Sequence, residues 1–257
     1  MGVNQCGTGC TVCVFDSGIG GLNLLHACAV RCPGADFLYF ADNFNMPYGE
    51  LPAEKVRRFV FDAFKKIASF SPAAAVVACN TATALCIADL RAQYPFPVIG
   101  IQPAVKQAVE CRGSCLVLAT PATSASPSFA RLCADYGEGR AEVLPCPGLA
   151  EYIERGIGAF PSFDGISRIL PRPDSSPSCV VLGCTHYVFA RDAIARHYGC
   201  DTFDGILGTA DHLADILGKK LNNSLINQNI EFIGGDHVKN EQIYRKIFGN
   251  YRNNADV

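Results

Sequence analysis

Short apolar runs alternate with longer amphipathic segments along most of the chain. The runs at residues 12–15, 74–78 and 114–119 are rich in Val, Leu and Ala, and each stops at a small or polar residue. Between the runs, apolar residues recur at helical spacing, as they do in 52–69. Strands of a parallel sheet that is covered on both faces are almost continuously apolar. The pattern therefore predicts parallel strands joined by helices through right-handed crossovers.

The same pattern assigns most of the chain to defined elements. Strands are expected at residues 12–15, 36–40, 74–78, 98–101, 114–119, 141–144, 180–183, near 202, and at 231–233. Helices are expected at residues 22–30, 52–69, 81–93, from after 123 to about 136, from about 146, and at 188–197, 207–220 and 240–248. A Pro- and Ser-rich loop is expected at 171–177, and a polar loop or hairpin at 222–229.

Two of the strands end in matching stretches that each contain a cysteine. One stretch is VVACNTA at residues 76–82, and its echo is VVLGCTH at residues 180–186. Ligands of open α/β sheets bind beyond the carboxyl ends of strands, so Cys79 and Cys184 are expected at such an edge. Thiols placed alike in two similar units would face each other across one pocket. We hypothesise that they are the acid and the base of a proton-transfer enzyme.

A second pair of strand ends supports an internal duplication. The strand that ends at Asp16 and the strand that ends at Thr120 are separated by nearly the same interval as Cys79 and Cys184. Alternating strands and helices in two such units predict two parallel sheets. The expected fold class is therefore α/β, with two pseudo-symmetric parallel-sheet domains and the active site in the cleft between them.

The composition narrows the class of protein. The chain has 257 residues, of which 49% are hydrophobic, and a net charge of −2. It contains no basic cluster and no apolar run of ~18 residues, so neither nucleic acid nor a membrane is an expected partner. The polar residues 1–10 lack the apolar core of a signal peptide, which favours a cytoplasmic location.

Cysteine usage argues against a disulfide scaffold and against a metal. The 14 cysteines are too few for such a scaffold in a chain of this length, and most are expected to be reduced and buried. Cys10 and Cys13 form a C-x-x-C pair with Cys6 nearby, but a zinc site usually needs a second pair. None follows at a suitable spacing, so we expect no metal site.

The first strand runs into a glycine-rich turn, DSGIGG, at residues 16–21. Its glycines do not follow the G-x-G-x-x-G spacing, so the turn does not predict a dinucleotide site. Two interpretations of Asp16 and Ser17 stay open. Either they cap the helix that follows, or they act chemically at the carboxyl end of the strand.

Several motifs occur together in one order. They are FDSGIGG (15–21), PYG (47–49), ACNTA (78–82), ATPAT (119–123), CP (146–147) followed by Glu154, and LGCTHY (182–187). With these motifs the chain resembles the glutamate racemases of the aspartate/glutamate racemase superfamily. The tail at 234–249 is similar to the family's C-terminal strand and helix.

The resemblance implies an activity and an organisation. The activity is racemisation of L- and D-glutamate without pyridoxal phosphate or metal, which supplies D-glutamate for peptidoglycan and so for the cell wall and cell shape. The chain is expected to return to its first domain, which gives one domain of residues 1–98 plus 207–257 and another of residues 99–206. Glutamate is the expected small-molecule partner, and a homodimer is the expected assembly.

The resemblance also assigns roles to individual residues. Cys79 is expected to remove the Cα proton of D-glutamate, and Cys184 that of L-glutamate. Asp16 is the expected partner of Cys79, while His186 and Glu154 are expected beside Cys184. The residues expected to hold the substrate are Asp16, Ser17, Tyr48, Gly49, Asn80, Thr81, Thr123, Thr185 and His186.

The chemistry needs residues of these types. Inverting a stereocentre by proton transfer takes a base on one face and an acid on the other, so one thiol must be ionised while the other is protonated. A free thiol has a pKa of ~8.5, and a modest downward shift gives a thiolate near neutral pH. An Asp or a His beside each thiol can hold or relay its proton.

Two stretches depart from the family's pattern, and other interpretations stay open. Gln102 precedes Pro103 where the family usually has an acidic residue, and residues 43–45 read Asn-Phe-Asn where the family usually has Thr and Arg. One alternative is a racemase of aspartate or a hydantoin. Another is a ligand-binding relative without turnover, and a third is a redox protein in which Cys79 and Cys184 pair reversibly.

Overall fold

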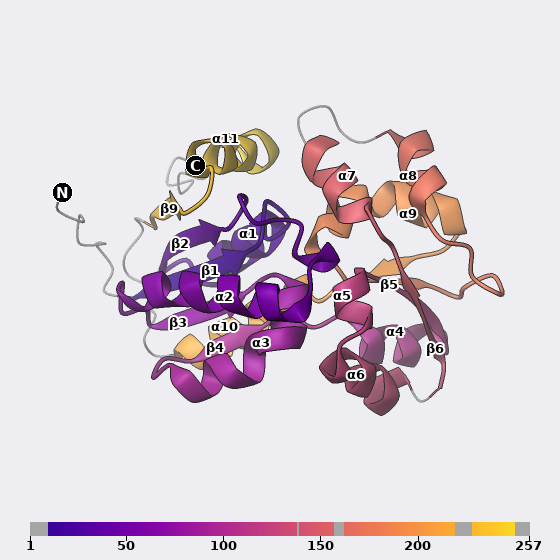
Figure 1. Cartoon of the computed structure of the whole chain (residues 1–257), viewed down its shortest axis with the longest axis horizontal. Helices are drawn as coiled ribbons and strands as arrows, with labels where there is room; N and C mark the ends of the chain where they lie inside the picture. The colour runs from indigo at the N-terminus through magenta and orange to yellow at the C-terminus, as the bar shows by residue number, and fades with distance from the viewer. Residues whose placement is uncertain (1–9, 138, 157–161, 219–227, 250–257) are drawn as a thin grey trace.

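The computed structural model describes residues 10–137, 139–156, 162–218 and 228–249 (Figure 1). Its strands form two sheets, which stand beside each other with helices on their faces. All the strand pairs are parallel. The predicted fold class, two parallel-sheet α/β domains, is confirmed.

The two sheets repeat one strand order. The first contains β4 (Val98–Gly100), β3 (Ala74–Val77), β1 (Thr11–Asp16), β2 (Asp36–Ala41) and β9 (Ile230–Ile233), in that order. The second contains β6 (Ala141–Pro145), β5 (Cys115–Ala119), β7 (Val180–Leu182) and β8 (Thr202–Phe203), in that order. When β1 is matched with β5, β2 matches β6, β3 matches β7 and β4 matches β8. This correspondence is the pseudo-symmetry that the repeated strand ends predicted.

Helices cover both faces of each sheet. One core of the first domain joins its sheet to α1 (Leu22–Arg31), α10 (Ile206–Leu217) and α11 (His237–Phe248), and the core on the other face joins it to α2 (Ala53–Ala68) and α3 (Asn80–Gln93). In the second domain, α4 (Val105–Arg112) and α6 (Pro127–Gly137) cover one face. The other face is covered by α7 (Leu149–Gly156), α8 (Phe163–Ile169) and α9 (Arg191–Tyr198). Each sheet is therefore buried on both sides, as continuously apolar strands require.

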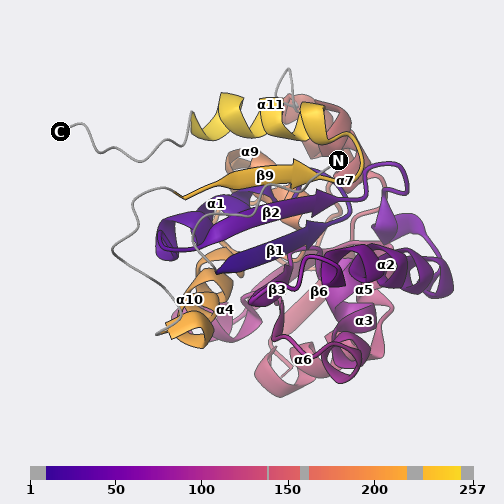
Figure 2. The ribbon, with the colours of Figure 1, turned by 90° about the vertical axis from the view of Figure 1, so that its left-hand side faces the viewer.

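The chain returns to the first sheet after β8. Helix α10 packs on α1, and β9 pairs with β2 in parallel. Figure 2 shows α11 lying along β9 at the edge of this sheet. Strand β4 still belongs to the first sheet, and the second sheet begins with β5. The exact division of the chain into domains remains a prediction.

Most of the predicted elements are present, and the differences have local causes. The helices α4 and α8 were not predicted, because each spans only two turns and offers few apolar positions. The short helix α5 (Pro121–Ser124) was not predicted. The helix expected from after 123 to about 136 is α6, and the hydroxyl of Ser126 accepts from the amide of Phe129 at its start. The helix expected at 188–197 begins as a 3₁₀ turn, η2 (Thr185–Ala190).

Some sequence-based expectations fall outside the described residues. Most of the polar segment 222–229, the N-terminal residues 1–9 and Cys6 are among these. Cys10 and Cys13 are described, and they contribute to the cores on opposite faces of the first sheet. Within the described ranges, no helix is long and apolar enough to cross a membrane.

Candidate active site

Both thiols lie at the carboxyl ends of matched strands, as predicted. Cys79 follows β3 and immediately precedes α3, while Cys184 follows β7 and immediately precedes η2. The two residues are buried, with 6% and 7% of their surface exposed. A negative charge on Cys184 contributes to raising the pKa of Cys79, so the two sulfur atoms are within electrostatic range of each other. The tertiary structure therefore brings the two thiols to one site.

The surroundings of Cys79 favour its protonated form. Burial raises the pKa of this thiol to about 12, and the charge of Asp16 adds to the effect. The amide of Ala82 and the hydroxyl of Ser17, whose Oγ lies 3.6 Å from the sulfur, oppose the shift but do not cancel it. At neutral pH, Cys79 is therefore a thiol and can act first as an acid.

Asp16 lies at the end of β1 and is fully buried. Its Oδ1 accepts from the amide of Gly18 at 2.9 Å, and its Oδ2 accepts from the hydroxyl of Thr185 at 3.2 Å. Burial raises the pKa of this carboxyl to about 6, although the charge of His186 pulls in the opposite direction. Helix α1 begins after Gly21 and has no side-chain cap, so the helix-capping interpretation of Asp16 and Ser17 is wrong.

The Cys184 side carries a buried acid–imidazole pair. The sulfur lies 3.8 Å from Nδ1 of His186, and Nε2 of the same ring lies 2.6 Å from Oε2 of Glu154. Burial lowers the pKa of His186, but hydrogen bonds to Cys184 and Glu154 outweigh burial and raise it well above its ordinary value. The pKa of Glu154 is lowered, because His186 and other donors outweigh the cost of burial. This side therefore holds an imidazolium between a carboxylate and Cys184.

Glu154 belongs to α7 of the second domain but is held by loops of the first. The amide of Ile19 donates to Oε2 at 3.0 Å, and the Asn43 amide group donates to Oε1 at 3.2 Å. Close approach of these loops depends on glycine: a Cβ at Gly20 would lie 2.5 Å from the hydroxyl oxygen of Thr185. The glycine-rich turn thus provides a tight contact between the domains at the site.

Three buried threonine side chains, contributed by both domains, place their hydroxyl groups within hydrogen-bond distance of one another near Cys79. Thr81 Oγ1 lies 3.0 Å from both Thr120 Oγ1 and Thr123 Oγ1, and the latter two are 2.9 Å apart. Thr120 was not among the predicted site residues, although its place at the end of β5, matching Asp16 at the end of β1, was a usable signal. Among the residues that the structure describes, none donates a hydrogen bond to the amide oxygen of buried Asn80, next to Cys79. A ligand with several acceptors and a donor would satisfy this group of side chains.

Tyr48 and Gly49 support the site through their contacts with neighbouring residues. The hydroxyl of Tyr48 donates to Oδ2 of Asp42 at 2.6 Å, and its ring packs against Phe15. Gly49 is buried against Thr120, where a Cβ would lie 2.5 Å from the threonine side chain. Tyr48 therefore braces the loop, while Gly49 reaches the threonine group.

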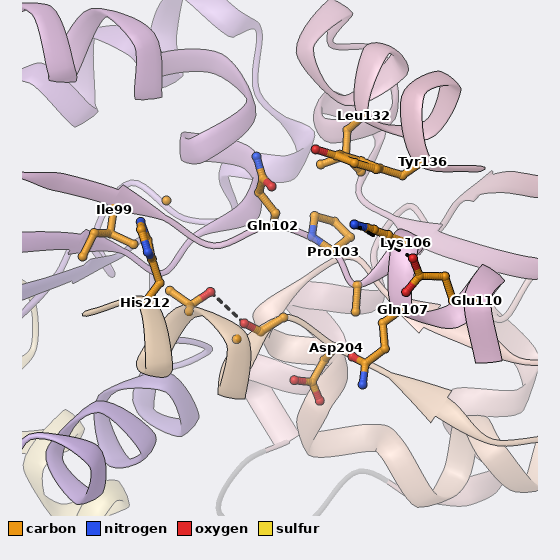
Figure 3. A pocket seen from close by; sticks show the side chains of 15 residues that line it. Ile99, Gln102, Pro103, Lys106, Gln107, Glu110, Leu132, Tyr136, Asp204 and His212 are labelled. Carbon is orange, nitrogen blue, oxygen red and sulfur yellow. Dashed lines mark hydrogen bonds and ion pairs between the residues drawn. The ribbon is translucent and has the colours of Figure 1, made fainter. Parts of the chain in front are cut away.

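A separate cavity lies where the two domains are linked, and it is not part of the thiol site. Its volume is about 490 Å³, and its lining includes Gln102, Lys106, Tyr136, Asp204 and His212 (Figure 3). None of the predicted site residues lines it. Among the described residues, no group of three or more His, Cys, Asp or Glu side chains is arranged to hold a metal ion.

Comparisons with known proteins agree with the geometry. The model of the Asp/Glu/Hydantoin racemase family matches residues 26–213. A glutamate racemase of Clostridium novyi is 39% identical over 252 residues, which is 95% of this chain and 92% of that protein. A solved glutamate racemase isoform of Bacillus anthracis is 28% identical, with a TM-score of 0.83 over 95% of both chains.

A second solved relative comes from Escherichia coli. That glutamate racemase, in complex with L-glutamate and an activator, is 28% identical, with a TM-score of 0.82 over 95% of both chains. The family match, the identity to a curated relative and the structural likeness all extend over most of the chain. With paired thiols at matched strand ends and these relatives, the chain belongs to the Asp/Glu/Hydantoin racemase family, in the group that contains the glutamate racemases.

Proposed function

We propose that this protein is a glutamate racemase that interconverts L- and D-glutamate by proton transfer between two thiols. The observation that carries the proposal is the placement of Cys79 and Cys184 at equivalent strand ends, both buried, with Asp16 acting on the charge of Cys79 and His186 beside Cys184. Two bases on opposite sides of one carbon are what inversion without a cofactor requires. The identity to glutamate racemases over nearly the whole chain supports glutamate as the substrate.

The charges suit turnover that begins with L-glutamate. An imidazolium at His186 is the partner that a thiolate at Cys184 needs, and Glu154 keeps that ring protonated. Cys184 removes the Cα proton of L-glutamate, and the thiol of Cys79 gives a proton to the opposite face. Removal of the proton from D-glutamate runs the same path in reverse, with Asp16 taking part in proton transfer at Cys79.

The remaining polar groups suit an amino acid with two carboxylates. The hydroxyls of Thr81, Thr120 and Thr123 provide donors for carboxylate oxygens, and donors aimed there stabilise the charge that develops when Cα loses its proton. The unpartnered amide oxygen of Asn80 accepts from the substrate ammonium group. Ser17, Gly49 and Thr185 complete the wall around the reacting carbon, and Tyr48 holds the loop in place.

The setting follows from the activity. D-Glutamate is a building block of peptidoglycan, so the protein serves cell-wall synthesis and acts in the cytoplasm, where the soluble precursors are made. We propose a homodimer as its assembly and no organic cofactor or metal for its reaction. A racemase of aspartate or a hydantoin is the competing assignment, and relative rates on the three substrates distinguish them.

The decisive experiment incubates the pure protein with D-glutamate in heavy water. Loss of optical rotation together with incorporation of deuterium at Cα is expected, because the product receives its proton from a thiol that has exchanged with solvent. Deuterium in the product during the first turnovers, ahead of deuterium in the remaining substrate, supports two separate bases. If optical rotation does not change with D-glutamate but the protein racemises D-aspartate, the substrate is aspartate and not glutamate.

A further inference from the structure

Asn43 links the acid of the site to the C-terminal helix. It lies in the loop after β2, and its Nδ2 donates to Oε1 of Glu154 at 3.2 Å. Its Oδ1 accepts from Nδ2 of Asn240 on α11 at 2.8 Å and from the amide of Asp236 at 3.3 Å. Nδ2 also donates to Oδ1 of Asn240 at 3.3 Å. One side chain thus connects the two domains and the returning C-terminal segment.

The orientation of the Asn43 amide is determined by its partners. A backbone amide can only donate, so the atom that faces Asp236 N must be the oxygen of Asn43. An ionised carboxylate can only accept, so the atom that faces Glu154 must be the nitrogen. The two requirements agree. Asn43 is therefore a hydrogen-bond donor to Glu154, and an acceptor could not replace it.

The segment before α11 is shaped around this amide. Gly235 has φ +37°, and a Cβ there would lie 2.5 Å from Oδ1 of Asn43. Asn240, one helical turn further on, is completely buried, although asparagine is usually exposed. A buried amide persists where its partners are satisfied, and here its partner is Asn43.

The contact with Asn43 matters because the two carboxylate oxygens of Glu154 have different hydrogen-bond partners. Its Oε2 already accepts from His186 at 2.6 Å and from the amide of Ile19 at 3.0 Å. Of the residues that the structure describes, Asn43 is the one that donates to Oε1. Without this donor, only the two hydrogen bonds to Oε2 restrain rotation of the carboxylate. Rotation would carry Oε2 away from the imidazole.

We propose that Asn43, held by Asn240, is a positioning residue that fixes Glu154 against His186 and thereby supports proton transfer at Cys184 rather than at Cys79. The proposal rests on the proposed racemase activity. Other ionisable groups also face this carboxylate from the surrounding elements. They are His186 from η2, Asp16 from β1 and Tyr39 from β2.

The test must separate the two faces of the substrate. For a racemase the values of kcat/KM for L- and D-glutamate are equal in every variant, because the two enantiomers have the same free energy. Irreversible elimination of halide from the L and D forms of a β-halo glutamate avoids this constraint. It needs only one base, Cys184 for the L form and Cys79 for the D form. Initial rates of halide release therefore report each thiol by itself.

The main variant is Asn43→Asp, which has the same shape and still accepts from Asn240 and Asp236. It replaces the donor to Glu154 with a second negative oxygen. We expect halide release from the L form to fall about tenfold at pH 8, as loss of one hydrogen bond to a charged group implies, with less than a twofold fall for the D form. At pH 5.5 the difference from wild type should shrink, because a proton on the introduced carboxyl restores a donor.

Two further variants keep the test decisive. Asn43→Ala removes the donor without adding charge, so it should show the same preference for the D form but no recovery at low pH. Val238→Asp adds one negative charge at an exposed position in the first turn of α11 and should match wild type. Thermal unfolding of each variant shows whether the fold is retained.

The outcomes separate this inference from the proposed function. Wild-type protein that racemises glutamate, with equal falls for L and D elimination in Asn43→Ala, overturns the positioning role and leaves the racemase intact. The same holds if Asn43→Ala folds and loses nothing. Wild-type protein that neither racemises glutamate nor releases halide overturns the proposed function and this inference with it.

Discussion

The buried carboxyl of Asp16 is expected to destabilise the folded protein when it is ionised. Its carboxyl is fully buried, and burial raises its pKa from 3.8 to about 6. A shift of about two pKa units corresponds to about 3 kcal/mol, by which the ionised form disfavours the folded state. The folded protein binds the proton more tightly than the unfolded chain. The contribution of Asp16 to stability is therefore most favourable below pH ~4 and is lost as the pH rises through 6.

Asp16→Asn should remove this penalty. The amide keeps an acceptor for Gly18 N, and the hydroxyl of Thr185 can reverse to accept from the new NH₂ group. We expect the free energy of unfolding to exceed that of wild type by about 1–3 kcal/mol at pH 7.5 and to match it near pH 4. Turnover should fall by roughly 100-fold, because an amide cannot take part in proton transfer.

Urea unfolding at pH 4 and pH 7.5, with racemisation measured on the same preparations, tests both parts. Asp135→Asn is the control, because its side chain is exposed and its removal should leave the pH dependence of stability unchanged. A variant that is destabilised equally at both pH values would assign Asp16 a structural role. Greater stability at pH 7.5 with unchanged turnover would refute its part in the chemistry.

Three other results are expected. Cys79→Ser and Cys184→Ser should each abolish racemisation. On a β-halo glutamate, Cys184→Ser should still release halide from the D form, and Cys79→Ser from the L form. A variant that retains both eliminations would mean that a single thiol serves both faces. A chelator and a carbonyl-trapping reagent should leave racemisation intact, and strong inhibition by either would contradict a cofactor-free reaction. Gly20→Ala should lower kcat at least tenfold while the protein stays folded, because its Cβ would displace Thr185; kcat equal to wild type would show that the loop can yield.

The sequence by itself determined the layered α/β architecture and the location of the chemistry. Apolar periodicity is local, and so the strands that end at Asp16, Cys79 and Cys184 could be recognised from their own residues. Each parallel sheet presents the carboxyl ends of its strands at one edge, and the likeness of the two units is why cysteines after matched strands pointed to one site. The short helices α4 and α8 escaped notice because two turns give too weak a periodic signal.

The tertiary structure alone decided how the site is assembled from distant parts. Ile19 and Asn43 reach Glu154 only because loops of the first domain pack against α7 of the second, and His186 reaches it from η2 within the second domain. The pKa of Asp16 depends in the same way on burial, which no local pattern encodes. Tyr48 donates to Asp42, and Thr120 joins Thr81, through contacts set by loop geometry. Strand and helix signals lie within a few residues of the chain, whereas hydrogen bonds and desolvation depend on which distant residues meet.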